Sequence, residues 1–384
     1  MTLRPTPVLL SVAFRPFFLL AAIWAAASMG LWLAALTGAS WLPAPGPAWH
    51  AHELLFGVVA AAAAGFALTA VATWTGTPAL AGWPLLGLVL LWLAGRLIWL
   101  ITGGPTLVTA GVNLMFLPAV CLALLSRLLP AGNRRNYPLA LILLVFTAAQ
   151  ATWYFGPAWQ QLGVSAGMLT VAAMISLIGG RITPAFTRNW LRAHQRLETV
   201  RDFPALEIAN VGALLLAAVA ILLGMTGLTA GLTLIAAAAA AARCTGWNSG
   251  RILGEPLLWV LHLAWLWLVL GLLLNGLTGL GLLPMSLGWH ALGAGTIGTI
   301  LIGVMTRVSL GHTGRPLVLP QGSTFLYVLI TLAALSRVGS AAFPALNTLP
   351  MLAFAAIAWF AAWIGFLLLF APMLLSPRPD GRPG

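Results

Sequence analysis

The sequence predicts an all-α polytopic membrane protein with twelve transmembrane helices and both termini in the cytoplasm. Three observations carry this prediction: an apolar composition, twelve apolar segments of spanning length and the positions of the arginines. Of the 384 residues, 61% are hydrophobic and 6% are charged, whereas soluble domains have about 45–50% apolar and about 25% charged residues. So few polar residues cannot cover a soluble protein of this length, and a soluble globular fold is excluded.

The chain is strongly basic, with a formal net charge of +12 and a pI of about 11.7. In a soluble protein such a charge would indicate a nucleic-acid partner. Here every basic residue is an arginine, and the arginines separate apolar segments, which is typical of membrane topology. We therefore expect a lipid bilayer, and no nucleic acid, as the partner of this chain.

The apolar segments set the number of spans, because a helix needs about 20 mostly apolar residues to cross a bilayer. The predicted spans are 16–38, 50–74, 83–102, 107–129, 137–156, 159–180, 204–225, 228–248, 255–278, 287–308, 322–342 and 349–375. The longest stretch between spans, 181–203, is too short for an independent soluble domain. Residues 1–384 are therefore predicted to form a single twelve-helix membrane domain.

The arginines orient these spans, because positive residues accumulate on the cytoplasmic side of a membrane protein. If the N-terminus with Arg4 is cytoplasmic, every arginine except Arg96 and Arg337 falls in an inner segment or at the inner end of a span. A missed or additional span would reverse this alternation from that point onward. The arginines thus favour twelve spans with both termini inside.

Three histidines are predicted at the outer surface, where a metal site can form. Trp49-His50-Ala51-His52-Glu53 opens the second span, and His290 opens the tenth. Ionisable residues within spans are costly and mark functional sites, and imidazole suits copper, zinc and haem iron. We expect His50, His52 and His290 to bind a metal. The alternative is a structural role, in which Trp49 and His50 cap the helix at the membrane interface and Glu53 stabilises its first turn.

The spacing within this motif leaves the ligand set open. On a helix, His50 and His52 point roughly 200° apart, so they share one metal only if His50 precedes the first turn. Otherwise each serves a different centre. His50 and Glu53 lie on one face, so the Glu53 carboxylate is expected to orient a ligating histidine without binding the metal itself.

A second, inner-side site is predicted from His262 and His312. His262 lies within the ninth span, and His312 follows the tenth between two glycines that allow the segment to fold back. The alternatives are a hydrogen bond from His262 to a neighbouring helix and an ordinary turn at His312. His194, in the arginine-rich inner loop, is expected to be solvated.

Arg96 lies in the outer half of the third span. Arginine pairs well with carboxylates, so a haem propionate is the predicted partner of Arg96, and snorkelling of the side chain to the surface is the alternative. The chain has no CxxCH motif and no cluster of cysteines. Any haem is therefore expected to be held noncovalently, without thiolate–metal centres.

Several strings, taken in order, resemble one family. They are Phe14-Arg15-Pro16-Phe17-Phe18, WHAHELLFG over residues 49–57, Thr73-Trp74-Thr75-Gly76, GRITPAFT over residues 180–187 and RVSLGHTGRP over residues 307–316. Together they resemble the NnrS family of bacterial haem- and copper-containing membrane proteins associated with nitric oxide. The strings are spread over residues 14–316, which is most of the chain.

The resemblance implies a protein of the bacterial inner (cytoplasmic) membrane that binds haem b noncovalently and also copper. Its ligand or substrate would be nitric oxide, in reduction, detoxification or protection from nitrosative stress. Whether the protein turns nitric oxide over, as an oxidoreductase, or only binds it stays open. Two other classes stay open as well: a twelve-helix secondary transporter and a membrane scaffold for metal handling.

Overall fold

The structure is a computed structural model that describes residues 7–39 and 46–382, so the predicted inner position of Arg4 lies outside the described residues. The protein is 81% helical, and no strand occurs within the described ranges. This result confirms the predicted all-α class.

Twelve helices within the described residues are long and apolar enough to cross a membrane. They are α1 (Phe14–Leu36), α2 to α3 (Pro47–Thr75), α4 (Gly82–Thr102), α5 (Leu107–Leu128), the 3-10 turn η3 with α6 (Arg134–Trp153, in which α6 is Tyr137–Trp153), α7 (Pro157–Ala193), α8 (Pro204–Leu222), α9 (Thr226–Cys244), α10 (Pro256–Gly279), α11 to α12 (Met285–His312), α13 (Ser323–Ala342) and α14 (Leu349–Leu375). Their number and order match the predicted spans, and their length and composition indicate a multi-pass membrane protein. The orientation of the termini stays a prediction.

The helix α7 is longer than its predicted span, which ended at residue 180. It has 37 residues and so extends about 55 Å, well beyond the hydrocarbon core of about 30 Å. Hydropathy reports where apolar residues end, whereas a helix continues as long as its backbone groups pair. The arginine-bearing turns after residue 180 therefore stay helical although they are not apolar.

Two of the spanning helices contain a seven-residue π-helix. In the second span, α2 (Pro47–His52) is followed by η2 (Glu53–Val59) and then by α3 (Ala60–Thr75). In the tenth span, α11 (Met285–His290) is followed by η5 (Ala291–Ile297) and then by α12 (Gly298–His312). Each π-helix starts directly after a predicted ligand, His52 or His290. π-helical turns are rare and occur frequently at functional sites.

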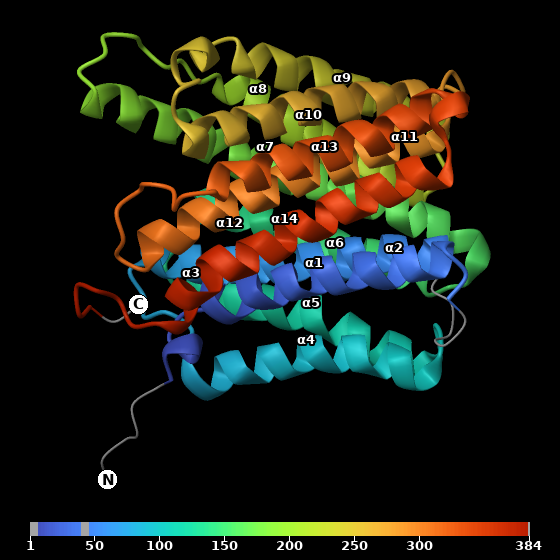
Figure 1. The fold of residues 1–384 in the computed structure, drawn as a ribbon, viewed down its shortest axis with the longest axis horizontal. Helices are drawn as coiled ribbons and strands as arrows, with labels where there is room; N and C mark the ends of the chain where they lie inside the picture. The colour runs from blue at the N-terminus through green and yellow to red at the C-terminus, as the bar shows by residue number, and fades with distance from the viewer. Residues whose placement is uncertain (1–6, 40–45, 383–384) are drawn as a thin grey trace. The chain divides into compact units, whose positions relative to one another are not determined.

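The chain divides into two compact units, which are described separately. Unit 1 comprises Met1–Gln161, Met305–Pro320 and Trp363–Gly384; unit 2 comprises Leu162–Val304 and Gln321–Ala362. In unit 1, α5 packs against α3, α4 and α6, and α1 packs against α3 (Figure 1). In unit 2, α9 lies between α8 and α10, and η5 packs against α10 and α13. A single membrane domain over residues 1–384 stays a prediction.

Small residues let η5 and α12 approach α10 closely. A Cβ atom added to Gly295 would lie 2.5 Å from the Trp267 ring, and one added to Gly303 would lie 2.9 Å from Val260. Ala291 lies in the same apolar cluster as Trp267. This face therefore serves helix–helix packing, as small residues commonly do in membranes.

The predicted topology can be tested with a reporter enzyme that is active only outside the cytoplasm. Inserted after Gly104, between α4 and α5, the reporter should be active, because this loop is predicted outside. Inserted after Gly132, beside the inner arginines, it should be inactive. The reverse pattern would contradict a cytoplasmic N-terminus.

The packing at Trp267 predicts that Gly295→Ala destabilises the protein by about 1–3 kcal/mol, the usual cost of overpacking. The measurement is thermal unfolding of the purified protein in detergent. Gly231→Ala in α9 is the matched control, because a Cβ atom there meets nothing within 4 Å. Equal melting temperatures for the two variants would show that the α10–η5 contact tolerates a side chain.

Candidate functional site

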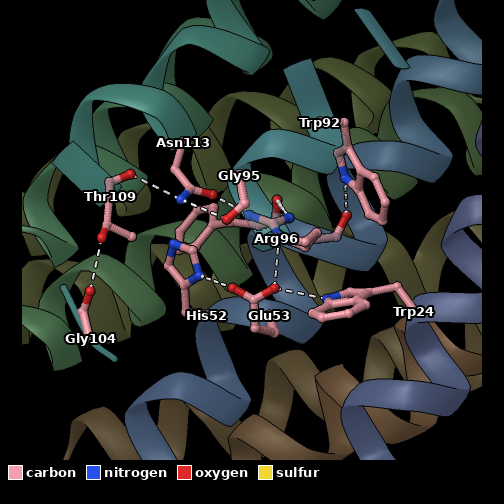
Figure 2. A network of polar contacts seen from close by, with 11 residues as sticks. Trp24, His52, Glu53, Trp92, Gly95, Arg96, Gly104, Thr109 and Asn113 are labelled. Atoms are coloured by element: carbon pink, nitrogen blue, oxygen red, sulfur yellow. Dashed lines mark hydrogen bonds and ion pairs between the residues drawn. The ribbon is translucent and has the colours of Figure 1, made fainter. Parts of the chain in front are cut away.

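A network of buried polar side chains lies inside unit 1 (Figure 2). The exposed fractions of His52, Glu53, Arg96 and Asn113 are 0%, 1%, 4% and 3%. They come from the α2–η2 junction, α4 and α5. Buried charges persist only where they are paired and hydrogen-bonded, so the partners of these four groups define the site.

The carboxylate of Glu53 is the centre of the network. Its Oε2 atom accepts a hydrogen bond from Trp24 Nε1 at 2.8 Å and lies 2.9 Å from Arg96 Nε. Its Oε1 atom lies 2.8 Å from His52 Nδ1. Because a carboxylate that is paired with arginine only accepts, His52 donates from Nδ1. The other ring nitrogen, Nε2, then carries a lone pair.

The guanidinium of Arg96 connects this carboxylate to α5. Arg96 donates to the Oδ1 atom of Asn113 and, at 3.4 Å, to the carbonyl of Phe56. Asn113 in turn donates from Nδ2 to the carbonyls of Gly95 and Thr109, at 3.2 and 3.0 Å. Asn113 therefore forms a hydrogen bond between α5 and α4. Charge and hydrogen-bonding capacity are thus largely balanced within the network.

Two glycines make room for these side chains. A Cβ atom on Gly57 would lie 2.9 Å from Arg96 Nη1, and one on Gly95 would lie 2.8 Å from Asn113 Oδ1. Trp92 on α4 donates to the carbonyl of Gly57 at 3.1 Å. The close approach of η2, α4 and α5 at this point therefore depends on the absence of side chains.

The Nε2 atom of His52 is buried and has no hydrogen-bond partner among the described residues. The imidazole lies among aromatic rings: ring centroids of Trp153, Phe56, Tyr154 and Trp99 lie 4.6, 5.3, 5.4 and 5.9 Å away. A metal-bound histidine usually donates the N–H of its other ring nitrogen to a carboxylate, and this hydrogen bond orients the ring. The donor chemistry of His52 therefore fits a metal ligand, for either copper or haem iron.

The histidine that Glu53 orients differs from the one expected. Sequence spacing favoured His50, three residues earlier, but Glu53 contacts its neighbour His52 where the π-helix begins. His50 lies within α2 and stacks on Trp32, with ring centroids 5.0 Å apart. Because both histidines are helical and have different surroundings, the structure favours separate roles for them.

His262 in unit 2 has partners on both ring nitrogens. Its Nε2 atom lies 2.9 Å from Thr187 Oγ1, and its Nδ1 atom lies 2.7 Å from Ser249 Oγ. Thr187 gives its own hydrogen to the carbonyl of Thr183, so Nε2 donates to Thr187. The structure thus shows the alternative of a hydrogen bond to a neighbouring helix. Metal ligation by His262 stays a prediction that would displace one of these bonds.

The other histidines have different environments. His290 donates from Nδ1 to the carbonyl of Ser286 at 2.6 Å, and the exposed His194 stacks on Trp190 as a solvated residue. His312 is exposed, with its ring centroid 5.6 Å from that of Phe14. The backbone carbonyl of His312 accepts a hydrogen bond from Arg378. Arg378 also donates to the Asp380 carboxylate, which holds the pKa of Asp380 below its usual range.

The predicted joint sites combine residues of both units. His290 and His262 belong to unit 2, whereas His50, His52 and His312 belong to unit 1. The two shared metal sites therefore stay predictions. Within the described ranges, no group of three His, Cys, Asp or Glu side chains is arranged to hold a metal ion.

Arg96 does not snorkel, because it is 4% exposed and its guanidinium faces Glu53. A propionate partner for it stays a prediction. Sequence reasoning missed Trp24, Trp99, Trp153 and Tyr154 around this site. No pattern marked them, because the chain has 18 tryptophans and most predicted spans carry one or more.

A family model described as NnrS protein matches residues 8–378, nearly the whole chain. The match covers all five strings on which the resemblance rested and confirms it. No curated protein matches the chain.

The Glu53–Arg96 pair predicts a large cost for removing one partner. Glu53→Gln should lower the free energy of unfolding by about 3–5 kcal/mol, because it leaves the Arg96 charge buried without a counter-ion. Thermal or denaturant unfolding in detergent measures this change. The control is Glu198→Gln, whose salt bridge to Arg251 is partly exposed and should contribute only about 0–1 kcal/mol. Similar losses in both variants would contradict a buried ion pair.

Proposed function

Because the chain belongs to the NnrS family, we propose that it is a bacterial inner-membrane protein that binds haem and copper and that binds or transforms nitric oxide. Metal binding is supported by one observation: the Nε2 atom of His52 is buried and unpaired, while its Nδ1 atom is hydrogen-bonded to Glu53. His50, His290, His262 and His312 are the further ligands that this proposal includes.

Residues of this chain would prepare the His52 site in three ways. Glu53 keeps the imidazole in one tautomer and one orientation. Arg96 balances the carboxylate charge, so that only the charge of the bound group is added to the membrane interior. The rings of Phe56, Trp153 and Tyr154 exclude water from the imidazole.

When bound, haem iron or copper would supply the Lewis-acidic centre to which nitric oxide coordinates. Turnover of nitric oxide would also need an electron donor. Binding is therefore the part of the proposed activity that these residues support directly. A buried site in the membrane suits nitric oxide, because the molecule is small and uncharged.

The proposal predicts that the purified protein contains haem and copper. An absorption spectrum in detergent should show a haem band that shifts when nitric oxide is added, and elemental analysis should find copper. His52→Ala should lose one of the two groups, whereas His194→Ala, at an exposed position, should keep both. Wild-type protein that holds neither group, after expression with haem and copper supplied, would refute the proposed function.

A further inference from the structure

Three more buried polar atoms without a hydrogen-bond partner lie at the end of α6. They are Gln150 Oε1, Trp153 Nε1 and Tyr154 OH. Gln150 and Trp153 are 2% and 1% exposed. Trp153 and Tyr154 follow Gln150 at spacings of three and four residues, so each neighbours Gln150 on the helix surface.

Two of these residues, Trp153 and Tyr154, belong to the surroundings of His52. The rings of Trp153 and Tyr154 contact each other, with centroids 5.0 Å apart, and both contact the imidazole of His52. The α2–η2 junction and the end of α6 thus bring together unpaired polar groups that include His52 Nε2. Each buried group without a partner costs about 1–3 kcal/mol, and native proteins leave few of them. The unpaired atoms of His52, Trp153 and Tyr154, which lie against one another, therefore indicate a bound group.

The packing around His52 restricts the size of that group. Four aromatic rings lie within 5.9 Å of the imidazole, and its Nε2 atom is fully buried. A haem on Nε2 would need a flat space as large as the macrocycle. A metal ion bonded to Nε2 needs the space of one atom.

The donor types restrict its identity. A neutral imidazole with the nearby phenol oxygen of Tyr154 is a nitrogen and oxygen set, which suits copper, and copper binds such sites most tightly among the first-row divalent metals. The N–H of Trp153 can only donate, and the hydroxyl of Tyr154 can donate as well. Donors beside a metal ion match an acceptor atom on the metal's small-molecule ligand.

We propose that His52 is a copper ligand rather than a haem ligand, and that Tyr154 is a positioning residue that donates a hydrogen bond to the small ligand bound to this copper. The proposal rests on the proposed function, in which the protein holds both copper and haem. It assigns one of these groups to one histidine, and it gives the end of α6 a role in holding a diatomic ligand.

The first test is elemental and haem analysis of purified His52→Ala. Copper per chain should fall at least about tenfold, while the haem content stays as in the wild type. Loss of haem with retention of copper would overturn the assignment and leave the proposed function standing. A wild-type protein that holds neither copper nor haem would refute the proposed function itself, so the two failures are distinguishable.

The second test uses Tyr154→Phe, which keeps the ring and removes the hydroxyl. Carbon monoxide bound to the reduced copper is the probe, and its infrared stretching frequency is the readout. Tyr154→Phe should retain copper and shift this frequency, whereas Tyr137→Phe, at the other end of α6, should leave it unchanged. An unshifted frequency in Tyr154→Phe would overturn the role of Tyr154, and this variant decides that role even if His52→Ala does not fold.

Discussion

A negative charge inside a membrane-spanning segment governs the structure of unit 1. The carboxylate of Glu53 cannot be solvated by lipid, and an unpaired charge there would cost several kcal/mol. Arg96 supplies the counter-charge, and Trp24 and His52 supply the remaining hydrogen bonds. This requirement holds α1, the α2–η2 junction and α4 together at one depth, and Asn113 extends the constraint to α5.

The backbone adapts to this network in two ways. The wide turn of η2 begins at Glu53 and carries Phe56, whose carbonyl faces Arg96. Gly57 and Gly95 leave space where side chains would collide with Arg96 and Asn113. The result is a rigidly held imidazole with one nitrogen available, which is the arrangement that a metal site needs.

In unit 2 the buried Arg243 is also paired, but there the buried His262 has no free ring nitrogen. The fully buried Arg243 lies 3.2 Å from Glu207 and donates to the carbonyls of Ser176 and Gly180. His262 is bonded on both ring nitrogens, to Thr187 and Ser249. Where every donor and acceptor of a histidine has a protein partner, the side chain stabilises helix packing. Where one nitrogen has none, as in His52, the residue is available to a ligand.

The sequence by itself determined the class, the number and the order of the spans, because hydropathy is a local property and bilayer thickness sets the length of each apolar segment. It also identified His52, Glu53 and Arg96 as functional candidates, because ionisable residues are costly in lipid. Only the tertiary structure decided their partners. Sequence spacing assumes a regular α-helix, whereas a π-helix begins at Glu53 and α4 brings Arg96 to the same carboxylate. Contacts between helices distant in sequence, such as those of His52 with Trp153 and Tyr154, leave no periodic signal in either segment.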